Sequence, residues 1–343
     1  MKNYDAKSMT FTELSAQLAA LSLPAFRATQ LFDWLQQKGA MDYGEMTNLP
    51  APLRAQLAQV LPIYGCRILK KQVSALDGTV KYLFALHDGT AVESVLMRYK
   101  YGHTLCVSSQ AGCKMGCTFC ASARSGFVRD LTPSEILSQI HAAQREDGVR
   151  VSHVVLMGMG EPLDNYGNVL RFLALVSDSA GLNIGMRNIS LSTCGIVPRI
   201  YDLMALKLQL TLSVSLHAPN DEIRSRSMPI NRRYPLDALL SACRDYANAT
   251  SRRISFEYAM IQGVNDAPGH AKELSSRLRG MLCHVNLIPV NPITAQDGQP
   301  TPRAEIERFA AELQRRGIPA TIRRTLGSDI DAACGQLRLH TET

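Results

Sequence analysis

Four cysteines lie within fifteen residues of this chain, and their spacing is its most informative feature. Cys113, Cys117 and Cys120 form a C-x3-C-x2-C run, and Cys106 lies upstream of it. Three thiolates on one loop can bind three irons of a [4Fe-4S] cluster and leave the fourth iron open, whereas a structural zinc site takes four ligands. An open iron can bind S-adenosylmethionine (SAM) and reduce its sulfonium, which generates a carbon radical. A zinc site that borrows Cys106 or a distant histidine is the alternative.

The cysteine run resembles a known cofactor-binding signature. Gly112–Cys120 (GCKMGCTFC) has the spacing of the radical-SAM superfamily, and Gly158–Pro162 (GMGEP) resembles the glycine–glutamate element of the same enzymes. Glycines allow a ligand to approach the backbone closely, and Glu161 can accept a hydrogen bond from the SAM ammonium group. His217 follows a later predicted strand and could bind ribose or carboxylate, although a structural role explains it better when it is taken alone. Asn291 could bind adenosine or serve as a turn residue before proline.

The residues after Thr104 alternate between strand-like and helical segments, which predicts parallel strands joined by crossover helices. One helix is marked by a capping box, with Thr132 as N-cap and Glu135 three residues further on. Because candidate site residues recur at the ends of successive strands, we predict an α/β fold with a partial (βα) barrel. The predicted strands are Leu105–Ser109, Ser152–Met157, Asn188–Ser192, Leu208–Leu216, Ile254–Met260, Val285–Val290 and Ala320–Arg324.

Two regions precede the predicted barrel. Residues 1–62 have apolar positions at helical spacing and predict a small helical domain, a possible RNA contact, in which Trp34 belongs to the core. Residues 63–103 contain two strand-like runs, Val80–Leu86 and Ala91–Tyr99, which are joined by an Asp-Gly turn and predict a β-hairpin. The barrel and a C-terminal segment then occupy residues 104–343.

Composition favours an intracellular enzyme with a polyanionic partner. The chain has 343 residues, of which 46% are hydrophobic, enough to bury a full core. Its 37 Lys and Arg against 30 Asp and Glu give a formal charge of +7, which suits nucleic acid without requiring it. There is no apolar leader and no run long enough to span a membrane, so we expect a cytoplasmic protein with no membrane partner. Four cysteines outside the cluster run are expected to be buried and inert: Cys66, Cys194, Cys243 and Cys283.

Several longer motifs are similar to those of one family. The segment Gly327–Leu337 (GSDIDAACGQL), together with Thr104–Gln110 (TLCVSSQ), Ser215–Asp221 (SLHAPND) and Met228–Asn231 (MPIN), resembles the RlmN/Cfr family of radical-SAM RNA methyltransferases. The resemblance covers nearly the whole chain. It implies a [4Fe-4S] cluster on Cys113, Cys117 and Cys120, with SAM as the second cofactor.

The resemblance also implies a two-stage methyl transfer. Cys334 would take a methyl group from one SAM, and a 5′-deoxyadenosyl radical from a second SAM would convert it into a methylene radical that adds to an adenine carbon. Cys106 would resolve the covalent protein–RNA adduct by attacking the Cys334 sulfur, leaving a disulfide that thiols reduce. Glu93 matches the family's proton acceptor, whereas its strand position alone predicts a solvent-facing residue. The implied SAM contacts are Gly160, Glu161, Ser192, Ser215, Leu216, His217 and Asn291.

Within this family the substrates are an adenosine of 23S rRNA and, in the RlmN branch, an adenosine of tRNA, with flavodoxin or ferredoxin as a suitable electron donor. The two branches differ in the methylated carbon, C2 in RlmN and C8 in Cfr. Gly158–Pro162 and the context of Cys106 favour C2, whereas Arg232–Pro235 and the short length lean toward C8. A radical-SAM activase and a zinc-dependent RNA-binding protein are the alternatives from other classes. Phosphate contacts could come from five basic segments, although any one such run is more often a solvated face: Lys70–Lys71, Arg98–Lys100, Arg224–Arg233, Arg252–Arg253 and Arg323–Arg324.

Overall fold

A ten-stranded mixed sheet organises the molecule. The computed structural model describes residues 5–290, 300–332 and 336–337. The sheet order is β1-β2-β3-β4-β7-β8-β9-β10-β11-β12, antiparallel from β1 to β4 and parallel from β4 to β12. The strands are β1 (Cys66–Val73), β2 (Val80–Leu86), β3 (Ala91–Tyr99), β4 (Gly102–Cys106), β7 (Val151–Leu156), β8 (Ile189–Thr193), β9 (Thr211–Ser215), β10 (Ile254–Met260), β11 (Cys283–Pro289) and β12 (Ala320–Ile322).

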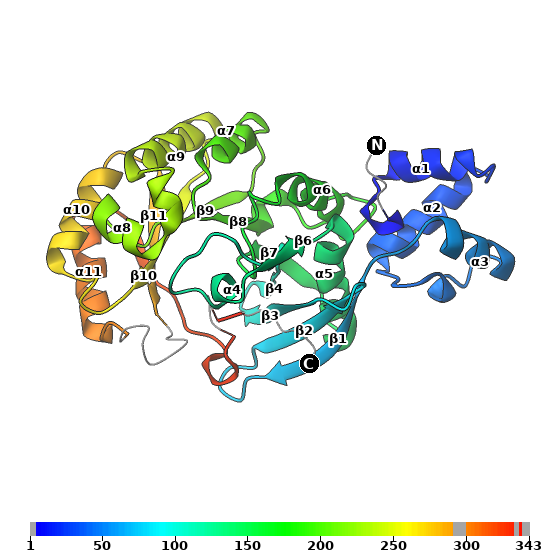
Figure 1. Ribbon diagram of the computed structural model, residues 1–343, viewed down its shortest axis with the longest axis horizontal. Helices are drawn as coiled ribbons and strands as arrows, with labels where there is room; N and C mark the ends of the chain where they lie inside the picture. Colours follow the sequence, from blue (N-terminus) through cyan, green and yellow to red (C-terminus); the bar gives the residue numbers. More distant parts are fainter. Residues whose placement is uncertain (1–4, 291–299, 333–335, 338–343) are drawn as a thin grey trace.

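The parallel half is an open (βα) barrel, which confirms the predicted fold class. Its helices lie along one side of the curved sheet (Figure 1). Along β9, Leu212 and Val214 are buried in the hydrophobic core, while Ser213 and Ser215 point into cavities on the other face, as the two-residue period of a strand requires. The helices after β4 are α4 (Ala121–Arg124), α5 (Pro133–Asp147), α6 (Tyr166–Val176), α7 (Val197–Ala205), α8 (Asp221–Ser227), α9 (Leu236–Thr250), α10 (Pro268–Leu278) and α11 (Arg303–Arg315).

The predicted strands all form, although several ends differ. The expected bounds of β2, β3 and β10 are those observed, whereas β4 ends at Cys106 and not at Ser109. Sequence patterns missed β1 and the two-stranded sheet of β5 (Gln110–Gly112) and β6 (Phe127–Asp130). Strand β1 is a partly exposed edge strand with an irregular register, so it lacks the alternation of buried residues that identifies a strand.

A small helical region precedes the sheet and has its own hydrophobic cluster. It contains α1 (Phe11–Ala20), α2 (Phe26–Phe32) and α3 (Ala51–Val60), and a π-helical turn follows α2 at Asp33–Gln37. Trp34 packs against this cluster, and its Nε1 donates to Asn48 Oδ1 at 2.6 Å.

Buried polar contacts join this region to α5 of the barrel. Ser134 Oγ donates to Asp5 Oδ2 at 2.9 Å, and the Ser134 amide donates to Ser8 Oγ at 3.0 Å. His141, also on α5, is buried, and its Nε2 lies 3.0 Å from the carbonyl oxygen of Gln36. Since that contact pairs with a carbonyl, Nε2 carries the proton and donates it.

The buried imidazole of His141 should make the protein acid-sensitive. Burial, with a further effect from the charge of Lys7, holds the pKa of His141 well below 6.5. As pH falls below 6.5 the unfolded chain binds a proton that the native protein does not, so the free energy of unfolding decreases. In urea unfolding at pH 6.5 and at pH 5, the variant His141→Gln, which keeps an amide donor for Gln36, should lose less stability on acidification than the unmodified protein. Equal losses would contradict this expectation.

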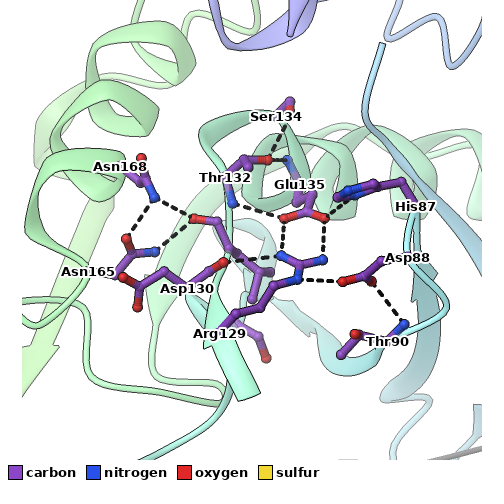
Figure 2. Close-up of polar contacts among 12 residues, drawn as sticks. His87, Asp88, Thr90, Arg129, Asp130, Thr132, Ser134, Glu135, Asn165 and Asn168 are labelled. Carbon is purple, nitrogen blue, oxygen red and sulfur yellow. Dashed lines mark hydrogen bonds and ion pairs between the residues drawn. The ribbon is translucent and has the colours of Figure 1, made fainter. Parts of the chain in front are cut away.

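Arg129 connects the strand after the cysteine loop to the hairpin and to α5 (Figure 2). Its guanidinium pairs with both carboxylate oxygens of Glu135 at 2.8 Å, and its Nε lies 2.6 Å from Asp88 Oδ2. The Arg129 contact holds the pKa of Asp88 well below its usual range. Glu135 also completes the predicted capping box with Thr132. The cysteine loop is therefore anchored at its C-terminal end before the barrel helices begin.

Candidate active site

One cavity lies at the carboxyl ends of the parallel strands, where barrel enzymes place their active sites. It brings together the three cysteines of the run and most of the residues expected to bind SAM. Its lining comprises Cys113, Met115, Cys117, Phe119, Cys120, Leu156, Met157, Gly158, Gly160, Glu161, Pro162, Ser192, Cys194, Ser215, His217, Met228, Glu257, Ala259, Ile288, Pro289, Val290 and Arg323.

The loop that carries the cysteines has a conformation that only glycine allows at its start. Gly112 has a φ of +76°, and a Cβ at this position would lie 1.9 Å from the carbonyl oxygen of Gly126. The amide of Cys113 donates to that same oxygen at 2.8 Å. Further along, the amide of Thr118 donates to the carbonyl of Ser227 at 3.0 Å, which holds the loop against the end of α8.

The three thiols suit an iron–sulfur cluster by their chemistry and their surroundings. Burial raises the pKa of Cys113 to about 12, and it raises the pKa of Cys117 as well. Each of these thiolates is also disfavoured by the charge of Cys120. Positively charged iron would offset both the burial of the thiolates and the repulsion from Cys120, because a metal stabilises the thiolates that bind it. Among the described residues, no three His, Cys, Asp or Glu side chains converge on a single metal ion, whereas a cubane distributes three cysteines over three irons.

Glu161 is buried on the wall of this cavity and is held by backbone amides. Its Oε1 accepts from the amide of Leu163 at 3.0 Å, and its Oε2 accepts from the amide of Cys194 at 2.7 Å. Burial raises its pKa. Gly160 before it has a φ of +99°, and a Cβ there would lie 2.5 Å from the Gln110 side chain. A cationic ligand group would offset the burial of this carboxylate.

His217 both supports the fold and faces the cavity. Its Nδ1 accepts from the amide of Ala259 at 2.9 Å, so its Nε2 carries the proton. Burial lowers its pKa to about 3, which keeps the ring neutral at physiological pH. The ring meets Phe119 of the cysteine loop edge-on at 4.9 Å. The backbone of His217 has a φ of +56°, in the left-handed region. Its carbonyl oxygen accepts a hydrogen bond from Asn265 Nδ2 at 2.8 Å, which stabilises this conformation.

Of the remaining residues predicted to contact SAM, only some lie in the cavity. Ser192 at the end of β8 and Ser215 at the end of β9 line the cavity. Leu216 is not among the residues that line the cavity: its side chain lies in the hydrophobic core, its amide donates to the Glu257 carbonyl at 3.0 Å, and its carbonyl accepts from Arg224 Nε at 3.1 Å. Asn291 lies outside the described residues.

Sequence reasoning missed Arg224 as a structural residue. It was expected to contact phosphate, but its side chain is fully buried. Its Nη2 donates to the carbonyls of Cys194 at 2.7 Å and Ser215 at 3.0 Å, and its Nε donates to that of Leu216 at 3.1 Å. Arg224 therefore ties together the loops after β8 and β9. These carbonyls lie eight, nine and thirty residues before Arg224 and meet it only because β8 and β9 end side by side, so the basic run itself gives no signal of the contacts.

A second missed group forms the floor of the cavity. Glu257 on β10 accepts from Asn286 at 2.8 Å and lies 3.8 Å from Arg323. Arg323 also contacts the sulfur of Met157 at 3.7 Å. Glu257, Arg323 and Met157 line both the cluster cavity and a second cavity toward the opposite end of the strands, whereas Asn286 lines only the second.

Glu93 and Cys106 lie on one face of the neighbouring strands. Cys106 on β4 pairs in register with Val95 on β3, and Glu93 lies two residues from Val95. Directly opposed and i, i+2 residues share a face of a sheet. The solvent-facing position expected for Glu93 is wrong: its side chain is 3% exposed and lies 3.3 Å from Lys81 Nζ. The C-terminal segment covers this part of the hairpin, which local periodicity does not reveal.

Cys334 lies outside the described residues, but the chain on either side of it is anchored. Asp329 accepts from Ser74 Oγ at 2.7 Å, and the Asp331 carbonyl accepts from Lys81 Nζ at 3.3 Å. After it, the Leu337 carbonyl accepts from Ser122 Oγ at 2.6 Å, on the short helix that follows the cysteine run. Figure 1 shows the C-terminal segment lying beside the β1–β2 hairpin.

The open barrel and its three-cysteine cavity define a radical-SAM enzyme. The radical-SAM superfamily model matches residues 107–274, and [4Fe-4S] and SAM are the cofactors of this class. A second model, described as a ribosomal RNA large subunit methyltransferase N-terminal domain, matches residues 5–63.

Relatives identify the family. A probable dual-specificity RNA methyltransferase RlmN of Lachnospira eligens is 51% identical over 97% of this chain and 95% of its own length. A protein of the same name from Desulforamulus reducens is 50% identical, over 98% and 96%. The crystal structure of a radical SAM methyltransferase from Sphaerobacter thermophilus is 46% identical, with a TM-score of 0.93 over 97% of this chain and 99% of that one. The chain belongs to the RlmN family, and it is a SAM-dependent radical RNA methyltransferase.

Proposed function

We propose that this enzyme methylates C2 of an adenosine in 23S rRNA and of an adenosine in tRNA. One observation supports the proposal most directly: Glu93 and Cys106 share a strand face, and β4, which carries Cys106, pairs with β7, whose end contributes Leu156 to the cavity that holds Cys113, Cys117 and Cys120. The arrangement suits a reaction in which a radical centre, a proton acceptor and a second thiol act in sequence on one base.

Cys113, Cys117 and Cys120 would hold the [4Fe-4S] cluster, and Glu161, Ser192, Ser215, His217 and Asn291 would position SAM. The position of Leu216 does not support the contact expected from it, because its amide and carbonyl both bond to protein groups. The loaded cofactors supply an electron to the sulfonium and hence a carbon radical. The neutral imidazole of His217 donates through Nε2 without adding a charge to the cavity. Gly160 leaves room for a ligand to approach the backbone.

Cys334 would first attack the methyl carbon of one SAM, so that a thioether forms and S-adenosylhomocysteine leaves. One hydrogen atom of this S-methyl group would pass to the carbon radical derived from a second SAM, and the remaining carbon would bond to the adenine. Glu93 would then accept the proton from that ring carbon. Cys106 would attack the Cys334 sulfur, breaking the sulfur–carbon bond and forming a Cys106–Cys334 disulfide; the released carbon would take up a proton to become the product methyl group. The one excess electron would return to the cluster that the run cysteines would hold, and an external dithiol would later reduce the disulfide.

RNA is supported as the substrate by a second cavity at the opposite end of the strands. Arg252, Arg253, Arg323 and Arg324 line it together with Tyr99, and hydroxyl groups of several strands complete its wall. Arginine and aromatic side chains are typical of single-stranded RNA contacts. Arg323 and Arg252 also contact protein groups, so Arg253 and Arg324 are the better candidates for phosphate.

The remaining assignments follow from this function. We propose residues 1–62 as a helical domain that contacts RNA, residues 63–103 as the hairpin that carries Glu93, and residues 104–343 as the catalytic barrel. A flavodoxin or ferredoxin would supply electrons. The enzyme would work in the cytoplasm, where its RNA substrates and reducing thiols occur. Among the described residues, no helix is long and apolar enough to cross a membrane.

The regiochemistry can be measured directly. We expect RNA treated with the reconstituted enzyme to yield 2-methyladenosine from both 23S rRNA and tRNA, because Gly158–Pro162 and the context of Cys106 favour C2. The same radical could react at C2 or C8, so the pocket decides which edge of the base it meets. Digestion followed by chromatography and mass spectrometry separates 2- from 8-methyladenosine. Predominant 8-methyladenosine would instead assign the Cfr reaction, with ribosomal antibiotic resistance as its consequence. Enzyme without SAM is the control.

A further inference from the structure

A buried lysine faces the proposed proton acceptor. Lys81 Nζ lies 3.3 Å from Glu93 Oε1, and the two side chains are 8% and 3% exposed. Lys81 Nζ also lies 3.3 Å from the carbonyl oxygen of Asp331. The lysine therefore bridges the carboxylate on β3 and the C-terminal segment.

The register of the hairpin explains why these groups meet. Leu83 pairs with Glu93, and Lys81 pairs with Val95, which also pairs with Cys106 on β4. Lys81, Glu93 and Cys106 consequently share one face, with Lys81 diagonal to Glu93. A shift of one residue would move Lys81 to the opposite face.

Other charged groups border the same cavity. Lys70 on β1 and Asp329 and Asp331 of the C-terminal segment line it together with Lys81 and Glu93. The Asp329 carboxylate is engaged by Ser74 Oγ and by the amide of Ala75. Of the two lysines, Lys81 is the one within ion-pair distance of Glu93.

We propose that Lys81 is a positioning residue that compensates the buried charge of Glu93 and orients its carboxylate for proton abstraction. The inference rests on the proposed role of Glu93. A buried carboxylate that loses its paired cation loses both the partner that offsets its burial and the contact that fixes its position. The second contact, to the Asp331 carbonyl, limits where the ammonium group can lie.

The test uses the full-length, cluster-loaded enzyme with RNA and the variant Lys81→Met. Its rate of methyladenosine formation at pH 7 should fall roughly tenfold or more, because a misplaced general base loses most of its effect. In its kinetic profile kcat should carry this loss, while KM for RNA should stay close to that of the unmodified enzyme. Formation of 5′-deoxyadenosine, which does not need a base, and iron content should be retained. Lys81→Arg should keep a profile close to that of the unmodified enzyme. Gln72→Met, which replaces another polar side chain of the same cavity, is the matched control.

An unchanged rate and profile in Lys81→Met would overturn the proposal. If Lys81→Met does not fold, Lys81→Gln provides the decision, because it keeps a donor and removes the charge. The variant Glu93→Gln separates the role of Glu93 from that of Lys81. Normal methylation by Glu93→Gln would refute the role of Glu93 itself, whereas an inactive Glu93→Gln beside an unaffected Lys81→Met would refute only the role of Lys81.

Discussion

Replacing any one of Cys113, Cys117 or Cys120 by alanine is expected to abolish cluster incorporation, 5′-deoxyadenosine formation and RNA methylation together. The three thiols are the cavity's only proposed iron ligands, and each would bind a different iron. The two remaining thiols therefore cannot replace a missing one. The expected loss is complete within the detection limit. Iron and sulfide analysis, visible absorption and chromatography of SAM products measure it after anaerobic reconstitution.

Cys194 provides a stringent control because it lines the same cavity. It lies outside the run, and its backbone amide, not its thiol, supports Glu161. Cys194→Ala should therefore retain a full cluster. A variant without all three run cysteines that still produced 5′-deoxyadenosine would refute the assignment of the cluster.

Exchanging Cys106 and exchanging Cys334 for alanine should give opposite outcomes. Cys334→Ala should accept no methyl group and leave RNA unmodified, since the methyl carrier is gone. Cys106→Ala should methylate Cys334, attach it to adenine and stop as a covalent protein–RNA adduct, because no thiol is available to break the sulfur–carbon bond. Multiple-turnover product should disappear in both variants. Denaturing gel electrophoresis with labelled RNA and mass spectrometry of peptides distinguish the two states.

Cys283→Ala removes a buried thiol at the start of β11 and should behave like the unmodified enzyme. Cys106→Ala should also keep its cluster, because Cys106 lies outside the run. Normal turnover by Cys106→Ala, with no adduct, would contradict the roles of Cys334 as the methyl carrier and of Cys106 as the resolving thiol.

Local patterns predicted much of the scaffold. The alternation of β2 and β3 around an Asp-Gly turn and the capping box at Thr132 are short-range features, and the structure has both. The edge strand β1 was not predicted, because it mixes apolar with charged residues and its partly exposed side chains show no regular alternation of burial. An edge strand needs no continuous apolar face, so its pairing partner defines it more than its own composition.

The burial of charged residues, by contrast, could not be predicted from local patterns. Arg224 belongs to a basic run, yet carbonyls from the ends of β8 and β9 surround it. Lys81 and Glu93 lie in strands whose alternation gives no sign of burial, and residue 331, distant in sequence, completes their surroundings. Segments that come from far along the chain determine which charges lose water, and no window of sequence contains that information.

The sequence by itself determined the chemistry available to this protein: three thiols at the spacing of a cluster loop, glycines where a ligand approaches the backbone, and the long motifs of the RlmN family. These features are set by covalent spacing and residue type. Tertiary structure alone decided which groups share a cavity, that Arg224 supports the strand ends, and that Lys81 faces Glu93. Strand register and long-range packing set those distances, because residues meet across a sheet only after the whole sheet has formed.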